Sequence, residues 1–346
     1  MSKVFIIAEA GSNWRHGPAN ADLDHIRALA MIRTAADCGA DAVKFQVWSS
    51  APVYAPDAGW PEYLAGRDGS INDLFNDLAL PTAWLPDLTT ECIKLGIEFM
   101  ASVFSPADVA VVDPFVKRHK IASYEIGYEE LIRAAASTGK PLILSTGAAT
   151  QEEVAWAVER ARRRYGVKSV TVMHCVAAYP APVEQTNLRV IARWSTGRVE
   201  NYRADVGLSD HTIDPILCPI AAVALGATMI EKHFTLGRNL DGPDHAFALE
   251  PNELAAMVRA VRQIESALGN RNKTVQPCEE PLRQFASRAV QAVRDIQPGE
   301  TIVAIGLNAN VAVLRPGNRR RGANAQFLSR MVGQTIDRFI RAGDGV

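Results

Sequence analysis

Two short apolar runs late in the chain, VGLSDHT (Val206–Thr212) and ATMIEKHFT (Ala227–Thr235), decide the fold that we predict. Each run has the length of a buried β-strand and stops at a cluster of polar and charged residues that contains a histidine, His211 or His233. Neighbouring strands of a parallel barrel end at the same rim, so the two imidazoles can face each other and hold a divalent metal ion. A single histidine of this kind is more often a buried residue paired with a neighbour. Two in equivalent places, with acids and hydroxyls beside them, favour the metal site.

The same pattern of short apolar runs and longer amphipathic segments recurs through residues 1–268. Apolar strands that alternate with helices indicate an α/β fold with a parallel sheet, and eight such units predict a (β/α)8 (TIM) barrel. A doubly wound sheet is the competing fold, but no glycine-rich nucleotide-binding loop follows the first strand. The predicted strands are Val4–Glu9, Ala42–Gln46, Glu98–Ser102, Lys120–Ser123, Pro141–Ser145, Ser169–His174, Asp205–Ser209 and Thr228–Lys232. The predicted helices include Asp22–Cys38, Trp84–Leu95, Gln151–Tyr165, Pro215–Leu225 and Glu253–Leu268.

Two further regions depart from this alternation. The segment from Gln46 to about Leu80 is rich in proline, glycine and aromatic residues, and it is too long for a simple connection. We expect a lid or wall of the barrel mouth there, with a disordered insert as the alternative. Residues 269–285 are polar and are predicted to be a linker. Residues 286–346 carry short strands, a PGE turn and a basic stretch, which predict a small second domain of mixed structure.

Composition narrows the classes of partner and the compartment. The formal net charge of −1 gives no electrostatic reason to expect nucleic acid or a membrane surface as a partner. The five cysteines are widely spread and have neither metal-ligand nor redox spacing, which is typical of reduced thiols in the cytosol. The first apolar run is too short for a signal sequence, and no run reaches the roughly 20 apolar residues that cross a bilayer. We therefore expect a soluble, cytoplasmic protein.

Lysines and serines follow several of the predicted strands. Lys44 and Lys120 supply positive charge, and hydroxyl groups near them supply hydrogen-bonding geometry, so together they predict a site for an oxyanion. The hydroxyls belong to Ser102, Ser123, Ser145 and Ser209. A lysine in such a place can instead form a Schiff base, which is the rival mechanism. Glu9 and Glu125 are candidates for acid–base chemistry, or they are ordinary salt-bridge partners of the two lysines.

Two imidazoles alone make an open metal site, whose other positions would be filled by carboxylate, water or substrate oxygens. Nitrogen and oxygen ligands of this kind suit Mn²⁺, Mg²⁺, Fe²⁺ or Zn²⁺. A metal bound there would polarise a carbonyl group as a Lewis acid.

The order and spacing of several motifs resemble the N-acetylneuraminate (sialic acid) synthase family, including the legionaminate and pseudaminate synthases. The motifs are IAEAGSNWRHG, DAVKFQ, KIASYEIG, LILSTGAAT, MHCVAAYP, GLSDHT, IEKHFTL and GPDHAFALEP. The tail, with SRAVQAVRDIQPGETI and VLRPGN, resembles the SAF (antifreeze-like) domain that follows the barrel in this family. The resemblance covers nearly the whole chain, and the motifs are specific as a set.

The resemblance implies a transferase that condenses phosphoenolpyruvate with an N-acylated hexosamine to a nine-carbon 2-keto acid and releases phosphate. It implies a divalent metal, for which we expect Mn²⁺, held by His211 and His233, with Glu9 handling protons nearby. The positions that match those holding phosphoenolpyruvate are Lys44, Ser102, Lys120, Ser123, Ser145 and Ser209. The positions that match the sugar site are Gln46, Glu125, Tyr179, Asp244 and Arg315.

Arg315 carries a further implication, because the matching arginine enters the active site of the neighbouring subunit. The resemblance therefore implies a domain-swapped homodimer, whereas residues alone would make Arg315 part of a solvated basic face. Three positions depart from the family pattern: Trp14, Tyr124 and Ala177. Ala177 replaces a polar residue that helps to hold phosphoenolpyruvate in the family. Tyr124 resembles the aromatic residue of pseudaminate synthases, whereas GPDH (Gly242–His245) is similar to the sialate and legionaminate branch, so the acceptor stays open between N-acetylmannosamine and a 2,4-diacetamido-6-deoxyhexose.

Two rival functions stay open on the sequence: a Schiff-base aldolase or lyase that uses pyruvate, and a non-catalytic carbohydrate-binding protein.

Overall fold

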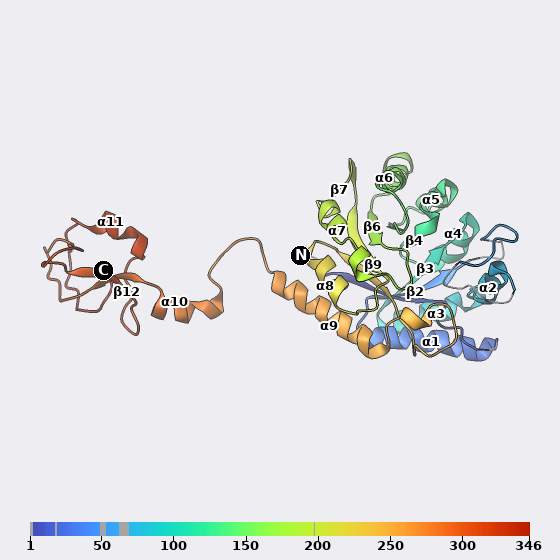
Figure 1. Cartoon of the computed structure of the whole chain (residues 1–346), viewed down its shortest axis with the longest axis horizontal. Coiled ribbons are helices and arrows are strands. Elements are labelled where there is room, and N and C mark those ends of the chain that lie inside the picture. Colours follow the sequence, from blue (N-terminus) through green and yellow to red (C-terminus); the bar gives the residue numbers. More distant parts are fainter. Residues whose placement is uncertain (1–2, 18, 49–52, 62–68, 197) are drawn as a thin grey trace. The chain divides into compact units, whose positions relative to one another are not determined.

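The structure, a computed structural model, describes residues 3–17, 19–48, 53–61, 69–196 and 198–346. The chain divides into two compact units, Met1–Gly269 and Asn270–Val346. In the first unit, eight parallel strands close a barrel in the order β1-β10-β9-β6-β5-β4-β3-β2, which confirms the predicted TIM barrel (Figure 1). The barrel strands are β1 (Phe5–Gly11), β2 (Ala42–Val47), β3 (Glu98–Val103), β4 (His119–Ile121), β5 (Leu142–Ser145), β6 (Val170–Cys175), β9 (Asp205–Asp210) and β10 (Met229–His233).

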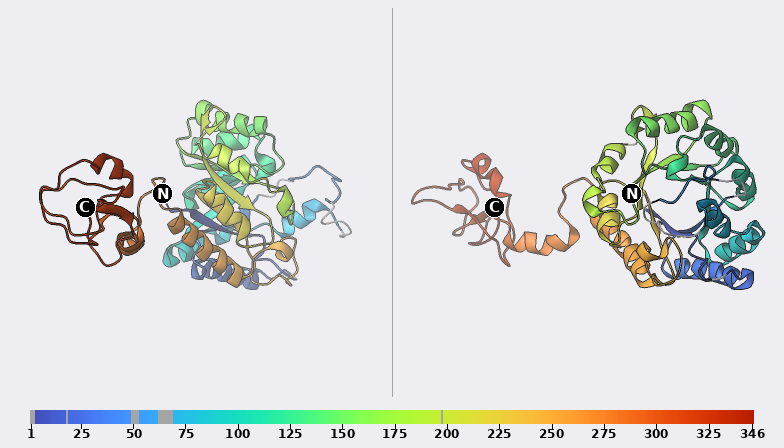
Figure 2. Two further views of the ribbon diagram at one scale, coloured as in Figure 1. Left: turned by 60° about the vertical axis from the view of Figure 1, so that its left-hand side comes forward. Right: turned by 45° about the vertical axis from the view of Figure 1, so that its right-hand side comes forward.

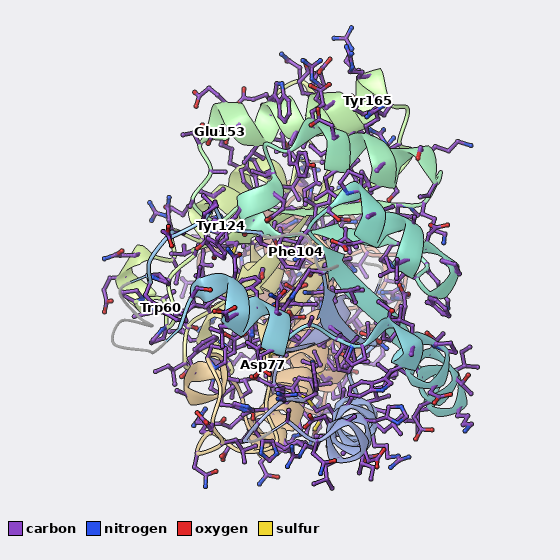
Figure 3. The ribbon with its side chains drawn as sticks, turned by 90° about the vertical axis from the view of Figure 1, so that its right-hand side faces the viewer. Trp60, Asp77, Phe104, Tyr124, Glu153 and Tyr165 are labelled. Atoms are coloured by element: carbon purple, nitrogen blue, oxygen red, sulfur yellow. The ribbon has the colours of Figure 1, made fainter. Side chains whose placement is uncertain are left out.

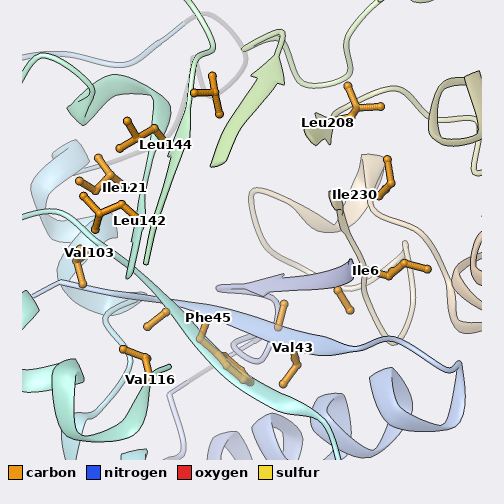
Figure 4. Close-up of a cluster of buried hydrophobic side chains, with 14 of the residues drawn as sticks. Ile6, Val43, Phe45, Val103, Val116, Ile121, Leu142, Leu144, Leu208 and Ile230 are labelled. Carbon is orange, nitrogen blue, oxygen red and sulfur yellow. The ribbon is translucent and has the colours of Figure 1, made fainter. Parts of the chain in front are cut away.

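The two faces of these strands have different roles, because successive side chains point to opposite sides. One set fills the interior of the barrel with the buried side chains of Ile7, Ala42, Met100, Ile143, Met173 and Met229. The other set packs against the surrounding helices; Figure 4 shows part of it, including Phe45, Leu144 and Ile230. The barrel is therefore a packed core, and the inward-facing residues nearest the carboxyl ends of the strands form the floor of the site.

Helices surround the strands, as the right-hand view of Figure 2 shows for this unit. They are α1 (Ala21–Asp37), α2 (Ile71–Asp77), α3 (Leu85–Leu95), α4 (Pro106–Val112), α5 (Glu129–Ser137), α6 (Gln151–Glu159), α7 (Arg189–Trp194), α8 (Leu217–Ala224) and α9 (Pro251–Leu268). The predicted helix over Gln151–Tyr165 is α-helical only to Glu159 and continues as a π-helical turn over Arg160–Arg164. A two-stranded hairpin that we had not predicted, β7 (Arg198–Val199) with β8 (Tyr202–Arg203), precedes β9.

Strand four is shorter than predicted. It ends at Ile121, and Ser123 already begins a 3-10 turn over Ser123–Glu125. The turn brings Ser123 and Glu125 to the carboxyl end of the barrel.

The amino-terminal end of the barrel contains a partly buried ion pair between Arg118 and Glu98. Arg118 forms two hydrogen bonds with Glu98, Nε to Oε1 at 2.8 Å and Nη2 to Oε2 at 3.0 Å. The same guanidinium lies 4.5 Å from the centre of the Phe5 ring. Charged groups at this end of a TIM barrel serve stability.

The predicted lid or wall after Gln46 falls partly on residues 49–52 and 62–68, which lie outside the described residues. Its described part contains α2, which Figure 3 shows with its last residue, Asp77, labelled. The Trp48 ring packs on Phe75 of this helix and on Phe104, with ring centres 5.0 and 5.4 Å apart. Arg15, in the loop after β1, donates to Asp77 at 2.5 Å. Aromatic packing and an ion pair therefore attach α2 to the barrel.

The second unit has its own core. Strands β11 (Ala289–Ala292) and β12 (Val311–Leu314) pair antiparallel. The unit also contains α11 (Leu328–Met331) and α10 (Glu280–Ala286), which overlaps the predicted linker over residues 269–285. Its buried apolar side chains are Val290, Ala292, Ile296, Ile302, Val311 and Ile340. Across the described residues of both units, no helix is long and apolar enough to cross a membrane.

Candidate active site

Buried charges gather inside the barrel at the carboxyl ends of β1 and β2. The Lys44 ammonium lies 2.7 Å from Oε2 of Glu9 and donates to the hydroxyl of Ser102, also at 2.7 Å. Gln46, two residues after Lys44, donates its amide to Oε1 of Glu9 at 3.0 Å. Lys44, Glu9 and Ser102 are each at most 2% exposed. The alternation of β2 thus places Lys44 and Gln46 on one face, where both hold Glu9.

Glu231, on β10, links this group to the opposite side of the barrel. Its Oε1 accepts from Lys120 at 3.1 Å and from the hydroxyl of Ser209 at 3.0 Å. Its Oε2 lies 3.8 Å from the Lys44 ammonium and accepts no hydrogen bond. One carboxylate therefore lies between two lysines that come from different strands.

The charges of these groups favour the binding of an anion at this end of the barrel. Burial alone would raise the pKa of Glu231, but the Lys120 and Lys44 ammonium groups lower it to about 2. Burial raises the pKa of Glu9 even though Lys44 opposes the change. Burial would lower the pKa of Lys44, yet Glu231 and Glu9 raise it overall. Glu231 stays ionised, Glu9 binds a proton more readily than an exposed glutamate, and Lys44 stays charged.

The remaining predicted serines lie on the next strands around the barrel. The hydroxyl of Ser123 accepts from the backbone N–H of Gly147 at 3.0 Å. The hydroxyl of Ser145, at the end of β5, is buried and has no hydrogen-bond partner among the described residues. A buried hydroxyl without a partner is costly, so Ser145 is a natural donor to a bound ligand.

His211 and His233 lie next to each other, with ring centres 5.5 Å apart. Nδ1 of His211 lies 2.8 Å from the carbonyl oxygen of Val176, an arrangement in which Nδ1–H donates and Nε2 is left as the free acceptor. Nδ1 of His233 is buried without a hydrogen bond and lies 3.6 Å from a carboxylate oxygen of Asp244. Burial, followed by the charges of His211 and Lys44, holds the pKa of His233 well below 6.5.

This pair fits a divalent metal only as part of an open site. Within the part of the chain that the structure describes, no three His, Cys, Asp or Glu side chains are grouped so as to hold a metal by themselves. A neutral imidazole is the ligating form, and a ring whose second nitrogen donates to a carbonyl is the usual arrangement of a histidine ligand. His233 meets the first condition, since its pKa is lowered, and His211 meets the second. Against the effect of burial, contacts with Cys175 and Val176 raise the pKa of His211 in the absence of a metal. The other ligands would be water and substrate oxygens.

Three of the predicted sugar-site residues are Tyr179, Asp244 and Glu125. The Tyr179 ring packs on His211 and lies near His233, with ring centres 4.3 and 6.2 Å away. Asp244 lies beside His233, and burial, with Glu9 adding to it, raises its pKa to about 6. Burial raises the pKa of Glu125 to about 7, and Oε2 of its side chain is buried without a hydrogen bond.

The other two residues of the predicted sugar set are Gln46 and Arg315, of which Gln46 lies near Asp244, because Nε2 of Gln46 and Oδ2 of Asp244 both border Gly11. Gln46 contacts Glu9, so its amide takes part in the floor of the site. Arg315 belongs to the second unit, directly after β12, and is exposed.

Three polar residues near the carboxyl ends of β6, β9 and β10 face away from the barrel interior. His174, Asp210 and Lys232 lie on the outer face, because they alternate with the inward-facing Cys175, Ser209, Glu231 and His233. His174 bonds the carbonyl of Thr186 at 2.7 Å, and the Lys232 ammonium bonds Asp210 at 2.5 Å.

Sequence reasoning assigned no role to three residues of the site. Glu231 is two residues before His233, so the alternation of β10 indicates that both face the interior. Its two lysine partners could not be predicted, because they lie on other strands, β2 and β4. Cys175 lies between Ser123 and His211, its sulfur 3.7 Å from the hydroxyl and 3.8 Å from Nδ1. Phe247, in a turn after β10, packs on His233 with ring centres 5.2 Å apart. Only a correct prediction of that loop could have found Phe247.

Comparison with known proteins identifies the group to which this arrangement belongs. The NeuB family model matches residues 31–273. The chain belongs to the NeuB family. It is 38% identical to the spore coat polysaccharide biosynthesis protein SpsE of Bacillus subtilis, over 99% of this chain and 92% of that protein. It is 33% identical to the pseudaminic acid synthase of Helicobacter pylori, over 97% of this chain and 94% of that protein.

A solved NeuB-family structure agrees. The N-acetylneuraminic acid synthetase of Leptospira borgpetersenii, in complex with citrate, superposes with a TM-score of 0.69 and 32% identity over 82% of this chain and 91% of that chain. Membership in the NeuB family confirms the predicted resemblance. It also makes the protein an enzyme, a phosphoenolpyruvate-dependent synthase of nonulosonic acids.

Proposed function

We propose that this NeuB-family enzyme condenses phosphoenolpyruvate with an N-acylated hexosamine, either N-acetylmannosamine or a 2,4-diacetamido-6-deoxyhexose, and requires a divalent metal ion, expected to be Mn²⁺. One observation carries the proposal: two buried lysines and a set of hydroxyls lie at the same end of the barrel as two adjacent imidazoles. This combination joins an anion site to a metal site at one end of the barrel. The relatives named as pseudaminic acid and N-acetylneuraminic acid enzymes support the class of acceptor.

Phosphoenolpyruvate would bind through the lysines and serines on the pocket floor. Lys44 and Lys120 provide two ammonium groups against the single firmly ionised carboxylate of Glu231, so a further anion is favourable there. Ser102 and Ser209 already contact these charged groups, and Ser123 and Ser145 extend the same wall. The free hydroxyl of Ser145 would gain the hydrogen bond that the protein does not supply.

His211 and His233 would hold the metal, whose chemistry when bound is the polarisation of the aldehyde carbonyl of the open-chain sugar. The Val176 carbonyl orients the His211 ring for this task. The Tyr179 and Phe247 rings pack against the two imidazoles and limit the access of water.

The reaction consumes one water molecule. Carbon 3 of phosphoenolpyruvate forms the new bond to the aldehyde carbon, water adds its oxygen at carbon 2, and the bond between carbon 2 and the phosphate oxygen breaks to release inorganic phosphate. Glu9 is placed to accept a proton from that water, because burial raises its pKa while Lys44 and Gln46 fix both of its oxygens. Glu125 and Asp244 would hydrogen-bond the sugar hydroxyls or its N-acyl group.

A panel of N-acyl hexosamines, each with phosphoenolpyruvate and Mn²⁺, tests the proposal by mass spectrometry of the product and by phosphate release. A nine-carbon keto acid together with stoichiometric phosphate is expected from at least one acceptor. No product from any acceptor of the panel would contradict it.

The Schiff-base alternative has a direct test of its own. Burial lowers the pKa of Lys120, which is what a lysine nucleophile needs, but the Glu231 carboxylate lies 3.1 Å away and favours the ammonium form. Borohydride with pyruvate should therefore leave the protein unmodified. A reduced adduct on Lys120 or Lys44 would instead establish the lyase.

We also propose that the enzyme acts as a domain-swapped homodimer in which Arg315 reaches the sugar site of the partner. The charges of the two units support this arrangement. Residues 1–269 carry 25 Lys and Arg against 32 Asp and Glu, whereas residues 270–346 carry 12 against 6. The second unit is thus basic and the barrel acidic, which favours their association.

Removal of the second unit tests this arrangement. A chain that ends at Leu268 should lose activity, and Arg315→Ala in the full-length chain should raise the KM for the sugar far more than that for phosphoenolpyruvate. Full activity of the isolated, folded barrel would refute the swap.

A further inference from the structure

The outer face of the barrel strands is apolar except at a few positions, and only β9 and β10 carry charged residues there. On β1 to β5, the outward-facing residue nearest the carboxyl end is apolar in each case: Ala10, Val47, Val103, Ile121 and Leu144. On β9 and β10 the corresponding residues are Asp210 and Lys232, which are 3% and 2% exposed. The preceding outward residues of these strands, Leu208 and Ile230, are apolar and are labelled in Figure 4. A buried ion pair among apolar side chains gives little net stability, so its presence between these two strands calls for another role.

The Lys232 ammonium uses all of its hydrogen-bonding capacity on one short segment. It donates to Oδ2 of Asp210 at 2.5 Å, to the carbonyl of Thr212 at 2.6 Å and to the carbonyl of Asp214 at 3.0 Å. Asp210 in turn accepts from the backbone N–H of Thr212 at 3.0 Å and from its hydroxyl at 3.1 Å. The segment from Asp210 to Asp214 is therefore wrapped around a single buried cation.

His211 lies in the middle of this wrapped segment, and His233 follows Lys232 directly. The parallel ladder between β9 and β10 ends with the pair of Asp210 and Lys232, so His211 lies beyond its last pair. His233 is held separately by pairing with Glu9 of β1. Backbone pairing between β9 and β10 thus stops at Asp210 and Lys232. Beyond this point, the hydrogen bonds of the Lys232 side chain connect the two strands.

We propose that Lys232 and Asp210 are positioning residues that fix the His211 backbone relative to His233 and so set the geometry with which the two imidazoles bind a divalent metal. The inference rests on the proposed metal role of the two histidines. Lys232 does not enter the proposed metal site itself. Its side chain lies on the outer face of β10, whereas Glu231 and His233 lie on the inner face. Its role resembles that of outer-shell residues, which orient ligands that they do not replace.

The test compares Mn²⁺ affinity with stability in the full-length protein, in the absence of substrates. Lys232→Met alone leaves the Asp210 carboxylate buried without its partner and is expected to destabilise the fold. The double variant Lys232→Met/Asp210→Leu removes both charges and keeps apolar volume, so it should retain most of the melting temperature. Asp210→Asn is a milder second variant that keeps the shape of the side chain.

We expect the double variant to bind Mn²⁺ roughly 10- to 100-fold more weakly than the wild type, measured by the electron paramagnetic resonance signal of free Mn²⁺. Its kcat should fall while its KM for phosphoenolpyruvate stays close to that of the wild type, because the Lys44 and Lys120 contacts are on the inner face. The matched control is Arg118→Met/Glu98→Leu, which removes an ion pair at the opposite end of the barrel and should leave the Mn²⁺ affinity unchanged.

Wild-type Mn²⁺ affinity in a folded double variant, or in Asp210→Asn, would overturn the positioning role. A failure of the proposed function has a different signature: the wild type itself would bind no Mn²⁺, or His233→Ala would bind it as well as the wild type. Either result would remove the basis of this inference as well.

Discussion

The two ends of the barrel both contain buried charges, yet they hold them differently. At the amino-terminal end, Arg118 and Glu98 satisfy each other through two hydrogen bonds, and the guanidinium also covers the Phe5 ring. At the carboxyl end, the pocket keeps polar atoms without partners: the hydroxyl of Ser145 and Nδ1 of His233. Complete pairing favours stability, whereas unpaired buried atoms lower it and are retained where a ligand supplies the missing bonds. The comparison holds for the inward-facing side chains: Nδ1 of His119, at the start of β4, is also buried without a partner, but this residue alternates with Lys120 and lies on the outer face of the strand.

The largest expected effect is at His233. His233→Ala should abolish turnover, because one of the two proposed metal ligands is lost, while the fold persists since Nδ1 makes no hydrogen bond within the protein. Steady-state phosphate release and a melting curve measure the two properties. Normal activity of this variant, or of the wild type in metal-free buffer, would reject the metal role.

Lys120→Ala should raise the KM for phosphoenolpyruvate by well over tenfold, from the loss of a charge-assisted contact of about 1.5–3 kcal/mol. The loss also leaves Glu231 with one ammonium partner fewer in a buried pocket. The KM for the sugar serves as the internal control, because the Lys120 ammonium is bonded to Glu231 and the proposed role of Lys120 is with phosphoenolpyruvate. An unchanged KM for phosphoenolpyruvate would reject the assignment.

At the amino-terminal end of the barrel, we expect a substitution to lower stability and to leave the kinetics unchanged. Arg118→Met should lower the free energy of unfolding by about 1–3 kcal/mol, because Glu98 stays buried without its partner. The values of KM and kcat should stay near those of the wild type. Urea denaturation followed by kinetics below the transition checks both. A loss of activity without a loss of stability at this position would show that the two ends are not functionally distinct.

The smallest effect is a pH dependence at Glu125. Burial raises its pKa in the folded protein to about 7 from an unfolded value of 4.5, so the stability that its protonated form contributes is present below pH 4.5 and is lost as the pH rises through about 7. Glu125→Gln stays neutral throughout. The variant should match the wild type near pH 4.5 and be more stable by about 1–2 kcal/mol above pH 8. Melting curves at the two pH values measure the difference, and an equal difference at both would contradict the raised pKa.

The sequence predicted the barrel and the gathering of Lys44, Lys120, His211 and His233 because period-two alternation and strand order are local properties that a parallel barrel converts into proximity. It did not predict the pairing of Glu231 with lysines of β2 and β4, since such contacts depend on how the strands stagger around the barrel. The sequence placed Asp210 and Lys232 near strand ends but did not show which side of the sheet their side chains face. A shift of one residue in the predicted strand would move each side chain to the opposite face. Phe247 and the described part of the segment after Gln46 depend on loop packing, for which the sequence carries little periodic signal.

The central claim is that two ammonium groups, which bind phosphoenolpyruvate, and two imidazoles, which bind the metal, belong to one site at the same end of the barrel. Pulsed electron–nuclear double resonance of the Mn²⁺ complex with bound phosphoenolpyruvate tests it most directly, because it detects phosphorus close to the metal. We predict a ³¹P coupling in the wild-type protein that disappears in Lys120→Ala under conditions where the metal stays bound. Bound Mn²⁺ and bound phosphoenolpyruvate without any such coupling in the wild type would contradict the account.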